Sequence, residues 1–352
     1  MAKRWMIYGA TGYTGALIAQ ECARRGLQPV LAGRDAVGLR LLAEPLHLQH
    51  VVVALDNATD LKQALKGFVA VLHCAGPFSQ TSAPMREACI AAGTHYLDIT
   101  GEIDVFVAAH DDAERARAAG VLLCPGVGFD VVPTDCVSVS LKAALPDATH
   151  LSLMFSGVDH LSAGTTVTSM EAIFRGTARV REDGRIIDIP FGDRSRMFDF
   201  GSGPERSFVI PWGDVATAGY STGIDNIEVH IPRASASARA IRALVPWRRL
   251  MAGPMARRVA HPLLRRLAGG PSPVRRAREL ARVWGEARNA AGAVKRAGLQ
   301  TLNGYSLTIL TAVLAVEHVL RHEVPAGYLT PTQLMGPDCL EHIEGAGKVV
   351  LI

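Results

Sequence analysis

The 352-residue sequence is long enough for roughly two domains. With 49% hydrophobic and 20% charged residues it has an ordinary globular composition, which excludes disordered, collagen-like and coiled-coil classes. The formal net charge is only +4, but residues 233–296 hold sixteen basic and two acidic residues, a local charge of +14 on an otherwise acidic chain. Such asymmetry is typical of a surface that faces a partner.

Short apolar runs alternate with helix-like stretches in the first 125 residues. The pattern predicts strands at 5–8, 30–32, 51–55, 70–74, 96–99 and 121–124. It predicts helices at 15–25, 82–92 and 104–119. Strict alternation indicates parallel βαβ units. The expected fold class is therefore α/β, with an N-terminal Rossmann doubly wound parallel sheet over residues 1–135.

A second, α+β domain is expected over residues 136–300, because the pattern changes after Pro133. A helix to Ala144 is followed by runs typical of antiparallel strands at 151–155, 185–190 and 227–231. Prolines are expected to divide the basic block, residues 233–296, into short helical pieces. An apolar helix is predicted near 306–321.

The first nine residues pass directly into a strand, without the apolar region of a signal peptide. No apolar run reaches the roughly 18 residues of a membrane span, so we expect a cytoplasmic protein. The six cysteines are widely spaced with no CxxC pair, which favours reduced, mostly buried thiols over a metal site or disulfides.

A glycine-rich loop, Gly9-Ala10-Thr11-Gly12-Tyr13-Thr14-Gly15, directly follows the first predicted strand and opens the first helix. That context is typical of a dinucleotide fingerprint. Gly9 permits the tight turn, Gly12 lets the backbone approach a pyrophosphate, and Gly15 allows close packing of helix on sheet. Thr11, Tyr13 and Thr14 complete the predicted cofactor contacts. The alternative is a glycine-rich turn without a ligand.

Ala32-Gly33-Arg34-Asp35 ends the second strand, where NAD-preferring sites carry an acid. The Arg34 guanidinium can pair with a 2′-phosphate, so NADP(H) is favoured over NAD. Alternatively, Arg34 makes only a surface ion pair or caps a helix. We place Gly33 in the same site, and assign Asp56 either to the adenine pocket or to the cap of the next helix.

Small residues close the fourth strand at the carboxyl edge, where open parallel sheets bind ligands. Ala75, Gly76 and Pro77 are expected to line the cofactor near the nicotinamide ribose. An ordinary strand-ending turn is the alternative interpretation.

Polar side chains follow the fifth and sixth strands and point to the same edge. Hydride transfer needs positioning, exclusion of water and one proton donor or acceptor. Tyr96, Glu102 and Asp130 are the predicted catalytic residues, with Asp98 as a further candidate. Glu102 could equally cap a helix, and Asp130 could bind the cofactor or form an Asx turn. No metal site is predicted.

These motifs, with Gly126-Val127-Gly128-Phe129-Asp130 and, more weakly, residues 327–336, resemble the saccharopine dehydrogenase-like oxidoreductases. The most similar branch is that of the trans-acting enoyl reductases. The resemblance implies an NADP-linked Rossmann domain onto which the C-terminal segment 301–352 folds back. It also implies a sheet-containing substrate domain that often builds a homodimer.

The resemblance and the loop together predict an NADPH-dependent reductase of the C=C bond in a lipid- or polyketide-like enoyl substrate. Tyr96 or Glu102, or a water they hold, would protonate the α-carbon. One alternative is a C–N bond reductase or dehydrogenase of saccharopine type, with Arg175, Arg179 and Arg181 available for a substrate carboxylate. Another is a non-catalytic, NADP-binding scaffold or membrane-associated interaction protein.

Arginine pairs recur every seven to ten residues beside leucines and methionines in the basic block, an amphipathic pattern. An acyl carrier protein, a CoA thioester or an anionic membrane surface would suit it, and a membrane contact would make the protein peripheral. The alternative is a solvated face that pairs with acidic residues of its own chain or a dimer mate. Nucleic acid is not expected, because no motif that reads it is present.

Overall fold

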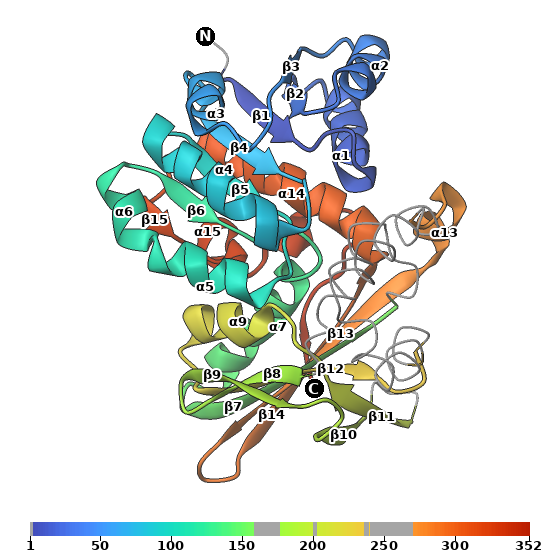
Figure 1. Cartoon of the computed structure of the whole chain (residues 1–352). Helices are drawn as coiled ribbons and strands as arrows, with labels where there is room; N and C mark the ends of the chain where they lie inside the picture. The colour runs from blue at the N-terminus through green and yellow to red at the C-terminus, as the bar shows by residue number, and fades with distance from the viewer. Residues whose placement is uncertain (1–2, 158–176, 200–202, 236–238, 240–269) are drawn as a thin grey trace, which may run out of the picture. The chain divides into compact units, whose positions relative to one another are not determined.

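The computed structural model describes residues 3–157, 177–199, 203–235, 239 and 270–352, and the chain divides into two compact units (Figure 1). The first unit contains Met1–Val132 and Leu307–Gly336, and the second contains Pro133–Ser306 and Pro337–Ile352. The segment 301–352 was expected to fold back onto the first domain. Only its part 307–336 groups there, because the last sixteen residues return to the second unit and end in a strand of its sheet.

The described residues of the first unit form a seven-stranded sheet in the order β15-β6-β5-β4-β1-β2-β3, and all of its pairings are parallel. Its strands are β1 (Trp5–Tyr8), β2 (Val30–Gly33), β3 (His50–Val52), β4 (Ala70–His73), β5 (His95–Asp98), β6 (Leu122–Cys124) and β15 (Gly327–Tyr328). β1 and β4 are buried along their whole length, as expected of central strands covered on both faces. The Rossmann prediction is confirmed.

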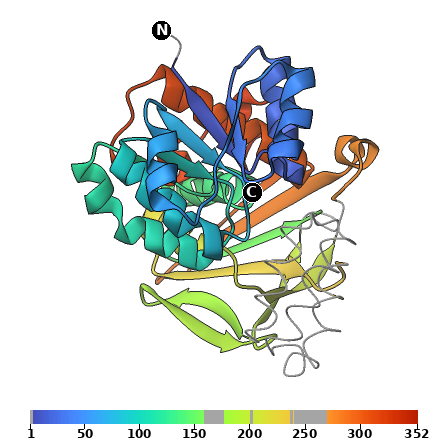
Figure 2. The same ribbon diagram turned by 45° about the horizontal axis from the view of Figure 1, so that its top comes forward.

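Helices cover both faces of this sheet (Figure 2). One face packs against α1 (Tyr13–Arg24), α2 (Ala36–Leu46) and α14 (Gly304–Arg321). The other face packs against α3 (Ala58–Leu65), α4 (Phe78–Ala92) and α6 (Ala113–Ala118). The unit also contains α5 (Ile103–Asp111) and α15 (Pro331–Met335). The helix predicted over 104–119 is two helices, divided at Asp112, whose carboxylate is held by Arg86 at 2.6 Å.

The second unit is built on a mixed sheet in the order β10-β11-β12-β7-β13-β14-β16, with a β8–β9 hairpin attached to β12. Its strands are β7 (Ala148–Ser156), β8 (Thr177–Glu182), β9 (Arg185–Pro190), β10 (Ser195–Asp199), β11 (Pro204–Val209), β12 (Asn226–Pro232), β13 (Leu280–Asn289), β14 (Val294–Leu302) and β16 (Val350–Leu351). Its helices within the described ranges are α7 (Val132–Ala144), α9 (Asp214–Thr222), α13 (Pro273–Arg278) and the 3₁₀ helix η2 (Cys339–His342).

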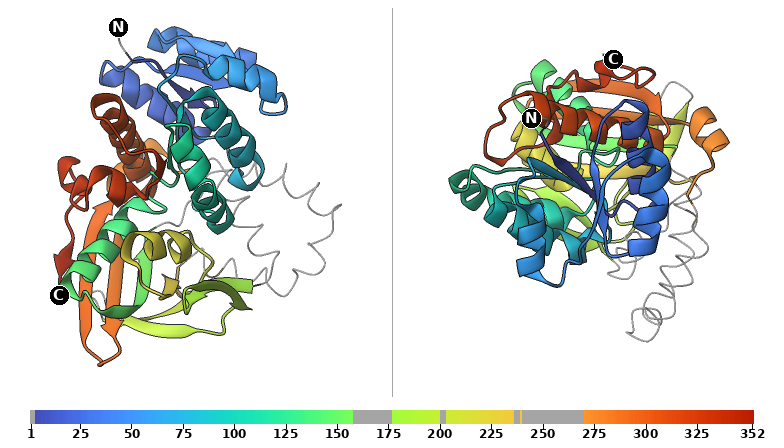
Figure 3. Two further views of the ribbon diagram at one scale, coloured as in Figure 1. Left: turned by 90° about the vertical axis from the view of Figure 1, so that its left-hand side faces the viewer. Right: turned by 90° about the horizontal axis from the view of Figure 1, so that it is seen from above.

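Two expectations for this unit hold only in part. The runs at 151–155, 185–190 and 227–231 do lie in strands with antiparallel neighbours, and α13 is a short helix within the basic block. Two other features differ from the expectation. β7 and β12 run parallel, with Leu151 opposite Ile227, because the long connection between them, which includes α9, returns the chain to the same end of the sheet. Residues 280–296 of the basic block form the paired strands β13 and β14 instead of helical pieces (Figure 3). Their period is two, with Ala281 and Val283 buried and Arg282 exposed between them.

The arginine pairs at 248–249, 257–258 and 265–266 lie outside the described residues. Of the helices within the described ranges, α14 included, none has both the length and the apolarity to cross a bilayer.

Candidate cofactor and active site

The loop between β1 and α1 has the backbone shape that a pyrophosphate site requires. Gly9 has φ +80°, and a Cβ there would lie 2.7 Å from the backbone nitrogen of Ala75. A Cβ on Gly15 would overlap the Gly9 carbonyl oxygen, so the first turn of α1 packs directly on the loop. The two glycines therefore hold this loop between the end of β4 and the start of α1.

The N-terminus of α1 is open to an anion. Gly12 is its N-cap, and no side chain caps the helix. Thr11 and Gly12 are exposed, and Tyr13 and Thr14 are partly exposed. Backbone N–H groups and the helix dipole attract a phosphate at such a position. The residues present therefore fit a dinucleotide pyrophosphate.

Arg34 follows β2 and is exposed. Among the residues that the structure describes, no hydrogen bond or ion pair engages its guanidinium. The neighbouring acid has another role, because Asp35 caps α2 and accepts a hydrogen bond from the Gly38 N–H at 3.0 Å. Arg34 is thus available to a 2′-phosphate, and the Asp35 carboxylate is held by the helix.

The charges of Arg34 and Asp56 both act on the hydroxyl group of Tyr8 in β1. This hydroxyl donates to the Val53 carbonyl at 3.1 Å, and burial raises its pKa. The charge of Arg34 lowers the same pKa, and that of Asp56 raises it. Asp56 is exposed and does not cap α3, since Asn57 accepts the N–H bonds of that helix.

The small residues after β4 lie against the loop. The Ala75 carbonyl accepts a hydrogen bond from the Thr81 hydroxyl at 2.6 Å, and Pro77 is the N-cap of α4. Gly76 is exposed. The nearby His73, at the end of β4, is fully buried, which lowers its pKa to about 3 and keeps its imidazole neutral. The assignment of Ala75, Gly76 and Pro77 to the nicotinamide end stays a prediction.

Glu102 binds the N-terminus of α4. One carboxylate oxygen accepts from the Phe78 N–H at 2.8 Å and the other from the Ser79 N–H at 2.7 Å. Glu102 is also the N-cap residue of α5, but its side chain does not cap that helix. The N-terminus of α4 thus already holds an anion, whereas that of α1 has no side-chain cap.

Tyr96 and Asp98 form a buried pair at the end of β5. Both are fully buried, and the Tyr96 hydroxyl donates to the Asp98 carboxylate at 2.6 Å. The other oxygen of Asp98 accepts from the N–H groups of Thr100 and Gly126, each at 2.9 Å. Burial raises the pKa of Asp98 to about 6 and that of Tyr96 well above its usual value. Asp98 therefore joins β5 to the loop after β6.

Asp130 lies on that same loop and is partly exposed. A Cβ on Gly101 would approach its carboxylate to 2.7 Å, so Asp130 is packed against the segment that carries Glu102. Burial, and after it the charge of Glu102, raises the pKa of Asp130 to about 7. This carboxyl group can therefore exchange a proton near neutral pH. A perturbed pKa at the edge of a cofactor-binding sheet is typical of a functional site.

Residues 5–124 match the family model of the saccharopine dehydrogenase NADP binding domain. This stretch is therefore similar to the NADP binding domain of saccharopine dehydrogenases. The match agrees with the parallel sheet of the first unit, and it supports NADP(H) as the cofactor.

Similar proteins extend the comparison. A trans-acting enoyl reductase of Mycobacterium ulcerans is 31% identical over 226 residues, which are 57% of this chain and 52% of that protein. One of Mycobacterium tuberculosis is 30% identical over 246 residues, which are 62% and 56% of the two chains. This chain thus spans about half the length of the curated relatives it matches. Apo saccharopine dehydrogenase (L-Glu forming) of Saccharomyces cerevisiae has a TM-score of 0.64 at 12% identity over the whole of both chains, a similarity of fold alone.

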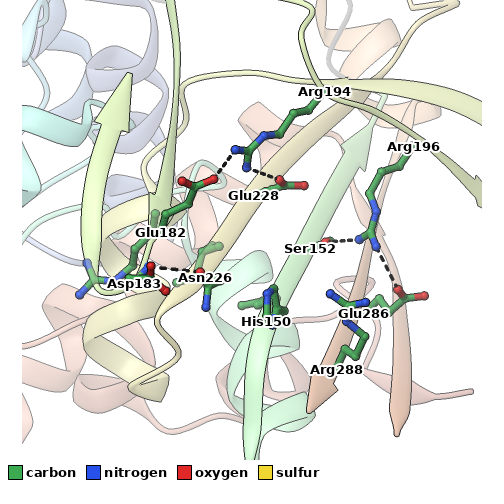
Figure 4. Close-up of a pocket in the computed structure, with 13 residues that line it drawn as sticks. His150, Ser152, Glu182, Asp183, Arg194, Arg196, Asn226, Glu228, Glu286 and Arg288 are labelled. Atoms are coloured by element: carbon green, nitrogen blue, oxygen red, sulfur yellow. Dashed lines mark hydrogen bonds and ion pairs between the residues drawn. The ribbon is translucent and has the colours of Figure 1, made fainter. Parts of the chain in front are cut away.

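The second unit has a polar cavity of about 340 Å³ on one face of β7, β12 and β13 (Figure 4). Its charges largely pair with one another: Arg194 contacts Glu228 at 2.7 Å and also Glu182, and Glu286 contacts Arg196 at 3.8 Å. This pairing leaves the cavity without a clear charge preference.

The arginines predicted to bind a substrate carboxylate do not converge within the described residues. Arg179 pairs with Asp188 at 3.5 Å, Arg181 packs against Gly219 of α9, and Arg175 lies outside the described ranges. Within those ranges, no group of three or more His, Cys, Asp or Glu side chains could hold a metal ion.

Proposed function

We propose that the protein is an NADPH-dependent oxidoreductase that reduces the C=C bond of an enoyl thioester with a lipid- or polyketide-like chain. The relatives named trans-acting enoyl reductase support the substrate class. The saccharopine dehydrogenase-type domain supports the cofactor. The observation that carries the chemistry is the partly exposed Asp130, a carboxyl with a pKa near neutrality at the carboxyl edge of the cofactor-binding sheet.

Different residues of the first unit bind different parts of the cofactor. The N–H groups of the first turn of α1 bind the pyrophosphate, with Gly9 and Gly15 setting the loop. Arg34 binds the 2′-phosphate, with Asp56 bounding the adenine pocket, and Ala75, Gly76 and Pro77 line the nicotinamide end. When bound, NADPH supplies the hydride that reduces the β-carbon.

Asp130 is the best proton donor of the three predicted catalytic residues. The Tyr96 hydroxyl is fully buried and already donates to Asp98. Both oxygens of Glu102 accept backbone hydrogen bonds, which favours its ionised form. The Asp130 carboxyl instead gives its proton to the α-carbon, and the carboxylate then takes a proton from water. Tyr96 and Glu102 are positioning residues: the first fixes the loop of Asp130 through Asp98, and the second raises the Asp130 pKa.

The test offers the purified chain NADPH with 2-enoyl-CoA thioesters of several lengths and, separately, with imines. NADPH consumption and the product mass are measured. We expect saturated thioesters to form, and expect Asp130→Asn to lower kcat about 100-fold. The exposed Asp111→Asn is the matched control and should leave kcat unchanged. Reduction of imines but of no enoyl thioester would establish C–N chemistry instead, and NADPH binding without any turnover would favour the scaffold.

The basic block is proposed to dock the carrier of the acyl chain, an acyl carrier protein. In the described part of the block, Arg282, Arg288 and Lys295 are exposed on the β13–β14 hairpin. If the carrier docks on these cationic side chains, salt should weaken the docking. KM for a carrier-bound substrate should then rise with salt concentration, while KM for a short CoA thioester should change less. Binding to anionic vesicles would indicate a peripheral membrane protein instead. Sedimentation tests the expected homodimer in the same preparations.

A further inference from the structure

We propose that Cys136 and Cys339 form a redox-active dithiol, which a small-molecule disulfide converts into an intramolecular disulfide. Their sulfur atoms lie 3.7 Å apart, and both side chains are fully buried. They come together from positions 203 residues apart in the chain. They are also the two cysteines of the second unit, since the other four belong to the first.

The pair sits where the chain twice enters the second unit. Cys136 is on α7, four residues after Val132, the last residue of the first unit before the chain leaves it. Cys339 opens η2, three residues after Gly336, where the chain leaves that unit again. A bond between the two sulfurs would fasten these two entering segments to each other.

The segment around Cys339 is held from its other side by β14. Gly347 has φ +74°, and a Cβ on it would overlap the Gln300 carbonyl oxygen. A Cβ on Gly345 would lie 3.1 Å from the Leu302 side chain. The backbone therefore approaches β14 closely over residues 345–347, while Cys339 faces α7. The two sulfurs are therefore carried by segments that are both packed within the second unit.

The reaction needs a brief opening of η2, because both thiols are buried. The contact with the Cys339 thiol and burial keep the pKa of Cys136 well above its usual value, so the Cys136 thiol is unreactive while the pair is closed. η2 has only four residues, and one short 3₁₀ turn can open locally while the rest of the unit stays folded. Once open, the Cys339 thiolate attacks oxidised glutathione and releases one glutathione thiol. The Cys136 thiol then attacks the mixed disulfide between Cys339 and glutathione and releases the second glutathione thiol. Two electrons and two protons thus pass from the two cysteines to glutathione.

The experiment equilibrates the full-length chain with glutathione buffers of increasing oxidised fraction and quenches it with acid. Intact mass and non-reducing peptide mapping are the readouts. We expect the loss of two hydrogens and a single linked peptide that joins Cys136 to Cys339. The oxidised chain should also unfold at a higher temperature than the reduced one, because the bond closes a long loop in the unfolded chain.

Cys136→Ala and Cys339→Ala should abolish the linked peptide, while Cys89→Ala, which removes another fully buried thiol, should retain it. The mapping of the unmodified chain decides the question even if a variant fails to fold. A link that involves any other cysteine, adducts with glutathione alone, or no mass change across the buffer series would overturn the proposal.

Discussion

The Glu102 carboxylate accepts a hydrogen bond from the Phe78 N–H at 2.8 Å, and so closes the N-terminus of a helix 24 residues away in sequence. The loop after β5 is thereby attached to the start of α4. An anion on a helix N-terminus is stabilising because of the dipole and the unpaired N–H groups. At the same sheet edge α1 keeps its N-terminus without a side-chain cap, and the exposed Thr11 and Gly12 of its glycine-rich loop leave that end accessible to a phosphate.

Replacing Glu102 by Gln should lower the free energy of unfolding by about 1–2 kcal/mol. The glutamine NH₂ group would face one of the two backbone N–H groups at the start of α4, and the negative charge at that helix N-terminus would be lost. Chemical denaturation measures this. The same change should lower the Asp130 pKa, since the Glu102 charge raises it. The pH profile of activity would then move to lower pH, whereas an unmoved profile would show that the two carboxylates are not coupled.

Arg34→Gln should weaken NADPH binding about 10- to 100-fold and leave NADH binding nearly unchanged, because a charged hydrogen-bond partner of the 2′-phosphate is lost. Quenching of tryptophan fluorescence on titration with each nucleotide measures both affinities. Arg40→Gln is the matched control: it is exposed on α2, with a long 3.9 Å contact to Glu44. Equal losses for both nucleotides would place Arg34 outside the 2′-phosphate site.

The sequence predicts the first unit well because its strands are short apolar runs separated by glycines. β1 is predicted at its observed bounds, and β2 to within one residue. α2 and α3 are not among the predicted helices. α2 contains Gly38 and Pro45, and α3 has eight residues with only Leu61 and Leu65 buried, so neither has a strong helical pattern.

The sequence predicts those site residues that belong to a local backbone motif. It does not predict the partners of site residues whose contacts come from distant parts of the chain. Gly9 and Gly15 are recognised from spacing alone, since their roles are local. The partners of Glu102 and Asp98 are not, because Phe78 and Gly126 are distant in sequence. For the same reason the parallel pairing of β7 with β12 escapes detection, as an isolated strand does not encode its neighbour's direction.

Gly15→Ala should reduce NADPH affinity at least about 10-fold and destabilise the chain by about 1–3 kcal/mol, because the new Cβ overlaps the Gly9 carbonyl and must push the loop away. Gly298→Ala is the matched control. It lies in β14, and its Cβ would meet only the end of the Ile352 side chain at 3.4 Å. Nucleotide titration and denaturation of both variants give the comparison. Undiminished NADPH binding by Gly15→Ala would show that the loop tolerates displacement.

Asp130 should make activity depend on pH in the neutral range. As a proton donor it acts in the protonated form, so kcat should fall as pH rises through about 7. Asp130→Asn cannot donate this proton, so its residual activity should lose this dependence. A wild-type profile without a decline in this range would exclude Asp130 as the donor.

Asp130 should also make stability depend on pH, because the folded state binds its proton more tightly than the unfolded state, whose carboxyl has the ordinary pKa of 3.8. The stabilisation by this proton is therefore complete below pH 3.8 and is lost as pH rises to about 7. Each unit of pKa difference corresponds to at most about 1.4 kcal/mol here, since the group is partly exposed. Asp130→Asn should be more stable than the unmodified chain at pH 8 and similar to it at pH 4. Denaturation midpoints at the two values measure this, and a variant less stable at pH 8 would mean that the folded state favours the carboxylate.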